Sequence, residues 1–139
     1  MSPTLPALLL AADTFQVVNS LIVSSAGPQS DAWLRACRLF DSAGAAWEIA
    51  ELCPSPVAPP AKRLFGKTLH SVELVVAGAK PYDVSALAVQ LCALVDRDPD
   101  DLYSQWVPHD RLKELLRGAS TPAGLVQTAA RLGRDEDAV

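Results

Sequence analysis

Three stretches of the chain have the apolar pattern of β-strands. Residues 6–11 and 71–77 are nearly continuous apolar runs, as buried strands show, and residues 46–53 alternate in part between apolar and polar positions. Gly78 and Pro81 interrupt the pattern after the second run. We therefore expect a small sheet of two to four strands built from these three stretches.

Helical spacing of apolar residues predicts about five helices, most of them in the C-terminal half. The clearest covers 84–95, with Asp83 as its natural cap. Further helices are expected to start at Asp98-Pro99, at Pro108 and at Pro122, because proline is favoured in the first turn.

Two more helices are predicted in the N-terminal half. The first covers 14–25, although its β-branched residues leave a strand over 15–24 as the alternative. The second would be capped by Ser30 or Asp31 and end at Gly44.

Together these elements predict one α/β domain over residues 1–139, with α+β and mainly α folds as the alternatives. A Pro-rich connector is expected at 54–62, because closely spaced prolines exclude a helix or a central strand. The charged end of the chain, 134–139, is expected to be a frayed tail.

Composition excludes several classes of protein. Half of the 139 residues are hydrophobic and 20% are charged, which is typical of a globular domain. The net charge is -4 and no basic stripe is present, so nucleic acid is not the expected partner.

The same counts predict a cytoplasmic protein. The three cysteines are odd in number and widely spaced, which indicates reduced thiols rather than a disulfide framework. The first twelve residues contain no Lys or Arg, so a signal peptide is not expected. Asp13, Gln16 and Asn19 interrupt the apolar start, so no membrane span is expected there.

Candidate chemistry is sparse. No phosphate-binding loop, metal-ligand spacing or catalytic constellation occurs, and no cofactor is expected. Cys53, between a strand and the Pro-rich connector, is a candidate reactive thiol. Gly78 and Lys80, expected between a strand and a helix, form a candidate anion site. Large side chains give four candidate binding residues: Trp47, Tyr82, Trp106 and His109.

One segment resembles a known family. It places Leu102-Tyr103, then Trp106, His109, Leu112 and Leu115, at the spacing of certain DNA-binding helices. The spacing is similar to the end of the DNA-binding domain of TetR-type repressors, which would make 83–117 a degenerate helix-turn-helix. Asp98, Asp100 and Asp101 stand in the would-be recognition helix, where their charge would oppose DNA phosphates.

We therefore expect a non-enzymatic protein-interaction or accessory module. It would use an apolar helix face to bind a protein partner or a second copy of itself. The alternatives are a DNA-binding regulator acting through 83–117 and a small enzyme or ligand-binding domain with a pocket near 78–83.

Overall fold

The computed structural model describes residues 2–12, 14–25, 27–54, 62–64, 67–96 and 109–132. Their helices and strands, in chain order, are β1 (Ala7–Leu10), β2 (Phe15–Val18), β3 (Ile22–Ser25), α1 (Pro28–Ala36), β4 (Arg38–Asp41), β5 (Ala45–Pro54), β6 (Lys62–Leu64), β7 (Lys67–Pro81), α2 (Val84–Asp96), α3 (His109–Gly118) and α4 (Pro122–Leu132).

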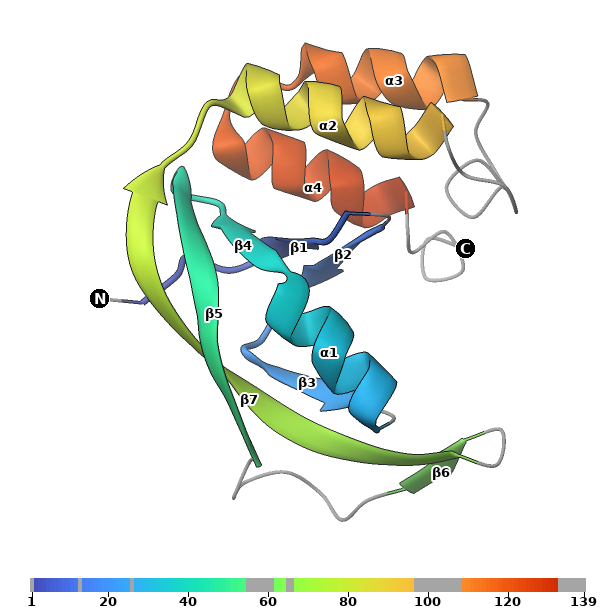
Figure 1. Ribbon diagram of the computed structural model, residues 1–139. Coiled ribbons are helices and arrows are strands. Elements are labelled where there is room, and N and C mark those ends of the chain that lie inside the picture. Colours follow the sequence, from blue (N-terminus) through green and yellow to red (C-terminus); the bar gives the residue numbers. More distant parts are fainter. Residues whose placement is uncertain are drawn as a thin grey trace.

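The strands form one antiparallel sheet in the order β2-β1-β4-β5-β7-β3, and β6 pairs with β7 beside this path. The two edge strands, β2 and β3, are consecutive in the chain and only residues 19–21 separate them. The sheet therefore curls into a near-barrel, with the long β7 bent around one side (Figure 1). The backbone N–H of Leu74 in β7 donates to the carbonyl of Leu21 at 2.7 Å, which links β7 to the segment between β2 and β3.

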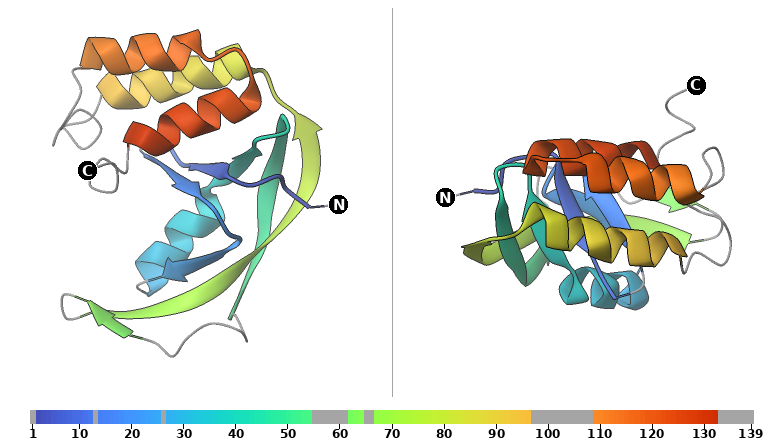
Figure 2. Two further views of the ribbon diagram at one scale, coloured as in Figure 1. Left: turned by 180° about the vertical axis from the view of Figure 1, so that it is seen from behind. Right: turned by 90° about the horizontal axis from the view of Figure 1, so that it is seen from above.

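Alternate residues of the strands pack against different groups of helices. Leu8 of β1 and Phe40 of β4 belong to a buried cluster shared with α2, α3 and α4. Their neighbours Leu9 and Leu39 belong to a second cluster on the other face, shared with α1 through Leu34. Figures 1 and 2 show the three C-terminal helices together at one end of the sheet and α1 inside the curve of β7.

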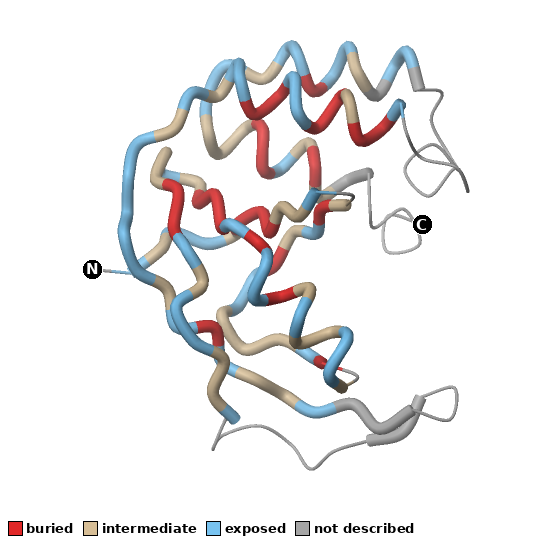
Figure 3. Tube along the Cα trace, in the orientation of Figure 1, coloured by how far each residue is buried: buried red, intermediate tan, exposed pale blue. Residues whose placement is uncertain are grey.

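Helix α2 is the apolar centre of the helical layer. The backbone N–H of Ser85 donates to Oδ1 of Asp83 at 3.3 Å, as expected of a capping residue. Two turns further on, Leu91 and Val95 are fully buried against the sheet and the other two helices. Figure 3 shows buried residues along α2 and in the strands below it, while α1, β3 and the far end of β5 are mostly half-buried or exposed.

The expected fold class is wrong. The sheet has six strands along its path instead of two to four, and four helices lie within the described residues instead of about five. The helix predicted over 14–25 is instead two short strands, β2 and β3, so the alternative of a single strand over 15–24 was right in type but not in extent. Phe15 packs on the helix side and Val18 on the inner side, so burial on two faces produced the helical spacing.

The helix predicted to run from Ser30 or Asp31 to Gly44 is correct only as far as Ala36, and it begins earlier, at Pro28, with Gly27 as its cap. Helix α1 ends at Ala36, and the chain continues as β4 and β5 joined by a tight turn. Gly44, with φ of +99°, lies in this turn rather than at a helix end.

Other expectations are confirmed. Strands are found within 6–11, 46–53 and 71–77, and helices follow Asp83, Pro108 and Thr121 as expected. The strand over 71–77 belongs to a longer element, β7, in which Val72, Leu74 and Val76 face the core while the residues between them are exposed. Most of the Pro-rich connector, the helix expected at Asp98 and the tail lie outside the described residues. No described helix is long and apolar enough to cross a membrane.

Candidate functional site

Two of the predicted binding residues donate hydrogen bonds to the same residue, Asp41 at the end of β4. Trp47 is 5% exposed, and its Nε1–H donates to Oδ2 of Asp41 at 3.0 Å. Tyr82 is half-buried, and its hydroxyl donates to the backbone carbonyl of Asp41 at 2.7 Å. Its ring also packs edge-on against Phe40, with the centroids 5.1 Å apart. In this geometry both aromatic residues stabilise the fold rather than face a partner.

Asp41 itself is 2% exposed and organises the turn between β4 and β5. Its Oδ1 accepts the backbone N–H groups of Ala43 and Ala45 at 3.0 and 2.9 Å, and its Oδ2 accepts that of Thr4 at 3.2 Å. Burial alone would raise the pKa of Asp41, but these hydrogen bonds and that of Trp47 outweigh it and lower the pKa. The carboxylate is therefore charged at neutral pH, and both of its oxygens accept hydrogen bonds from groups within the fold.

Sequence reasoning missed Asp41. The signal was present in the segment Asp41-Ser-Ala-Gly44, because Asp is favoured at the first position of a turn and Gly at the last. The predicted helix over the same residues concealed it.

The predicted anion site lies within a strand. Gly78 and Lys80 belong to β7, which continues to Pro81, so no loop separates a strand from a helix at Gly78. Between the pairs Ala46–Lys80 and Glu48–Ala77, β7 contains one residue more than β5. Gly78, with φ of +71°, forms this bulge, a conformation that glycine adopts at little cost. The glycine is thereby explained by strand pairing.

Of the remaining predicted residues, only Cys53 has a described side chain. Trp106 lies outside the described residues, and His109 is the first residue of α3, with its side chain not described. Cys53 is half-buried near the end of β5. Partial burial raises the pKa of its thiol, and the nearby Glu51 and Glu73 raise it further. A thiol with a raised pKa forms less of the nucleophilic thiolate at neutral pH.

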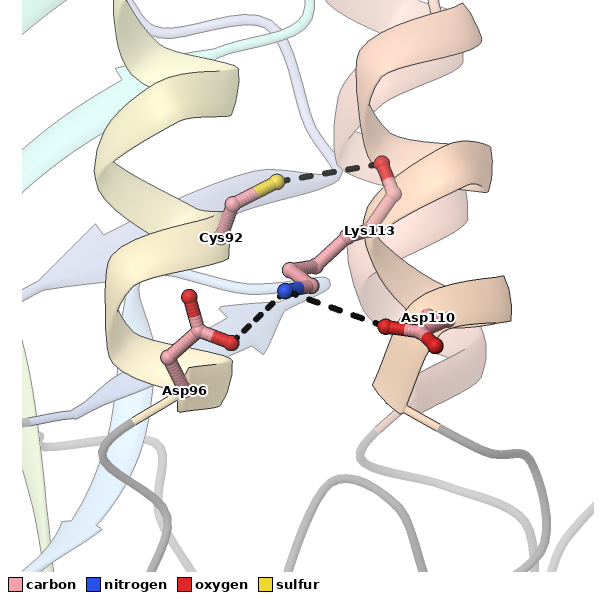
Figure 4. Close-up of polar contacts among 4 residues, drawn as sticks. All are labelled: Cys92, Asp96, Asp110 and Lys113. Carbon is pink, nitrogen blue, oxygen red and sulfur yellow. Dashed lines mark hydrogen bonds and ion pairs between the residues drawn. The ribbon is translucent and has the colours of Figure 1, made fainter.

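A polar cluster joins α2 and α3 (Figure 4). Nζ of Lys113 lies 2.9 Å from Asp96 and 4.0 Å from Asp110, and the Cys92 thiol donates to the Lys113 carbonyl at 3.8 Å. The hydrogen bond to Asp96 raises the pKa of Lys113, and burial raises that of Cys92. Both side chains therefore keep their protons at neutral pH, and the cluster holds two helices that run side by side (Figure 1). The would-be recognition helix of the predicted helix-turn-helix, with Asp98, Asp100 and Asp101, lies outside the described residues.

A groove of about 360 Å³ lies between α2 and the start of β4. We call it the α2 groove. It is lined by Leu10, Ala11, Ala12, Ala36, Arg38, Phe40, Gln90, Ala93 and Leu94. Phe40 and Leu94 are 4% and 6% exposed, so they form its apolar floor, while Arg38 and Gln90 are exposed at its rim.

The outer side of α2 extends this apolar surface. Ala86, Val89 and Ala93 are spaced three and four residues apart and therefore share one face of the helix. Val89 is 63% exposed, and α2 contains no charged residue before Asp96. We call this face together with the groove the α2 surface. It combines an exposed apolar helix with a hollow beside it, which is the geometry of many protein-docking sites.

Sequence reasoning expected an apolar helix face but did not identify the α2 groove, because β1, α1, β4 and α2 each contribute part of it. Among the described residues, no group of three His, Cys, Asp or Glu side chains is placed to hold a metal ion. Comparison of the chain with protein-family models, with curated proteins and with solved structures finds no match.

Proposed function

We propose that this protein is a non-enzymatic interaction module that binds a segment of a partner protein on the α2 surface. The observation that carries the proposal is Val89, which is 63% exposed on an uncharged helix face beside a groove of about 360 Å³. Water contact with this apolar area is unfavourable, and a partner side chain would remove it.

The geometry suits a short amphipathic segment. One aliphatic or aromatic side chain would enter the α2 groove above Phe40 and Leu94, and a second would cover Val89. Burial of the two anchors would contribute about 3 kcal/mol, and contacts along α2 would add to it. Because association also costs translational and side-chain entropy, this favours a transient complex.

The test is a selection of random 12-residue peptides on the folded chain, followed by binding measurements by fluorescence anisotropy. We expect peptides with two spaced apolar residues to be enriched. They should bind the V89D variant at least about tenfold more weakly, since a carboxylate would be buried under the partner. The matched control is V75D, the same substitution at a valine that is 38% exposed on β7 and does not line the α2 groove.

Two outcomes would overturn the proposal. One is the absence of enriched peptides, or peptides that bind V89D as well as they bind the native chain. The other is self-association, seen by analytical ultracentrifugation and abolished by V89D, because the occupant would then be a second copy of this chain.

A further inference from the structure

Arg38 occupies a distinctive place in the α2 groove. It is the first residue of β4 and lies two residues from Phe40, so both side chains are on the face of the sheet that the three C-terminal helices cover. Its guanidinium carbon lies 5.4 Å from the centre of the Phe40 ring, close enough for a cation–π contact. Among the described residues that line the groove, Arg38 alone has a charge.

Glu48, the acidic residue paired with Arg38 in the sheet, does not neutralise the charge of the guanidinium. Glu48 pairs with Arg38 across β4 and β5. A Cβ added at Gly78 would nevertheless lie 3.9 Å from Oε2 of Glu48, which places that carboxylate on the β7 side of β5. The ion pairs found among the described side chains involve Arg111 and Lys113, not Arg38.

We infer that the partner segment has an acidic side chain next to its apolar anchor, and that this carboxylate pairs with Arg38 when the anchor enters the α2 groove. This partner chemistry rests on the proposed function, because it concerns the same surface. A guanidinium donates two parallel hydrogen bonds to a carboxylate, which fixes orientation as well as charge. The Phe40 ring beneath Arg38 limits the freedom of the side chain, so less entropy is lost on binding.

The experiment uses the most enriched peptide from the selection, synthesised with both ends blocked so that its side chains are the only source of a carboxylate. We expect R38Q to weaken binding about tenfold, as loss of a charge-assisted pair does. The matched control is R35Q, which removes the same charge from an exposed arginine one turn away in α1 that does not line the groove. R38K should restore only part of the affinity, because an ammonium group does not form the paired hydrogen bonds.

A second arm changes the peptide instead of the protein. Replacing its Asp or Glu by the corresponding amide should weaken binding to the native chain by the same factor and should leave binding to R38Q unchanged. This double-mutant cycle isolates the pair and does not depend on how well R38Q folds.

The outcomes separate this inference from the proposed function. Peptides that lose affinity for V89D, but bind R38Q and the native chain equally well, would overturn the acidic partner and leave the docking surface intact. Peptides that bind only with a free C-terminal carboxylate would also overturn it, because the inferred source is a side chain. Peptides insensitive to V89D would overturn the proposed function itself.

Discussion

Replacement of Asp41 by asparagine tests whether the buried carboxylate holds the β4–β5 turn. The substitution keeps the shape of the side chain but converts one acceptor oxygen into an NH₂ donor. Oδ1 and Oδ2 each accept two N–H groups, so either placement of the amide leaves two of these donors without their acceptor. At about 1–3 kcal/mol for each unsatisfied donor, with water recruited at the more exposed ones, we expect a loss of about 3 kcal/mol in the free energy of unfolding.

The measurement is urea unfolding at pH 7, followed by circular dichroism and tryptophan emission. The matched control is D83N, the same substitution at an exposed cap where Asn is as favourable as Asp, so a loss below about 0.5 kcal/mol is expected. A loss of about 3 kcal/mol would be a large share of the roughly 5–15 kcal/mol that stabilises a domain.

Acid supplies a second test of Asp41. Because the pKa of Asp41 is lowered in the folded state, its contribution is present above the unfolded value of about 3.9 and is lost as the pH falls through the folded value. The difference in stability between the native chain and D41N should stay constant from about pH 5 to 8 and shrink below about pH 4. A D41N variant as stable as D83N, or a deficit unchanged in acid, would refute the role assigned to the carboxylate.

Three further predictions concern other described residues. Burial, followed by the charge of Asp41, raises the pKa of Tyr82 to about 12. A step in tyrosine absorbance near that pH should therefore be absent in Y82F. The same variant should lose about 1 kcal/mol of stability, because it lacks the hydrogen bond to the Asp41 carbonyl. The stability from the protonated phenol should fall between about pH 10 and 12 in the native chain. G44A should destabilise more than G78A in urea unfolding, because its new Cβ would lie 3.3 Å from a proline carbon while that of G78A meets nothing nearer than 3.9 Å; equal losses would contradict this. In thiol labelling of the folded chain, Cys53 should react before the two buried cysteines, and its rate should still be rising above pH 9; a rate that levels off near pH 7 would indicate a lowered pKa instead.

Sequence reasoning identified the elements whose apolar residues form either a regular helical stripe or a short uninterrupted run. Helix α2 has Leu87, Leu91 and Val95 on one side, and helical spacing predicts such a helix directly. Strand β7 was found for a similar reason, although Gly78 ended the prediction because a bulge and a loop both favour glycine.

The errors came from segments buried on two faces. In β4, Leu39 packs inside the near-barrel while Phe40 packs under the helices. When adjacent residues such as Leu39 and Phe40 are both buried, the alternation of apolar and polar positions that indicates a strand is lost. Together with Trp33 and Cys37, Phe40 then has the spacing expected of one face of a helix. In β2, Phe15 and Val18 have the same effect. Local spacing alone therefore could not distinguish β2 and β4 from helices, whereas β1, which is also buried on both faces, was recognised from its continuous apolar run.

The α2 groove could not be predicted from the sequence for a different reason, and that reason also concerns how a partner would bind there. Its floor residues, Phe40 and Leu94, are buried, so packing alone explains why they are apolar, while its rim depends on where α1 ends and β4 begins. That junction exists because the chain leaves the helix at Cys37, whose N–H still bonds to the carbonyl of Leu34, and enters the sheet at Arg38. The same junction places a cation at the mouth of an apolar groove. The pairing of β4 with β1 and β5 therefore fixes the position of Arg38. A partner carboxylate that binds this guanidinium depends on the register of the sheet as well as on the charge.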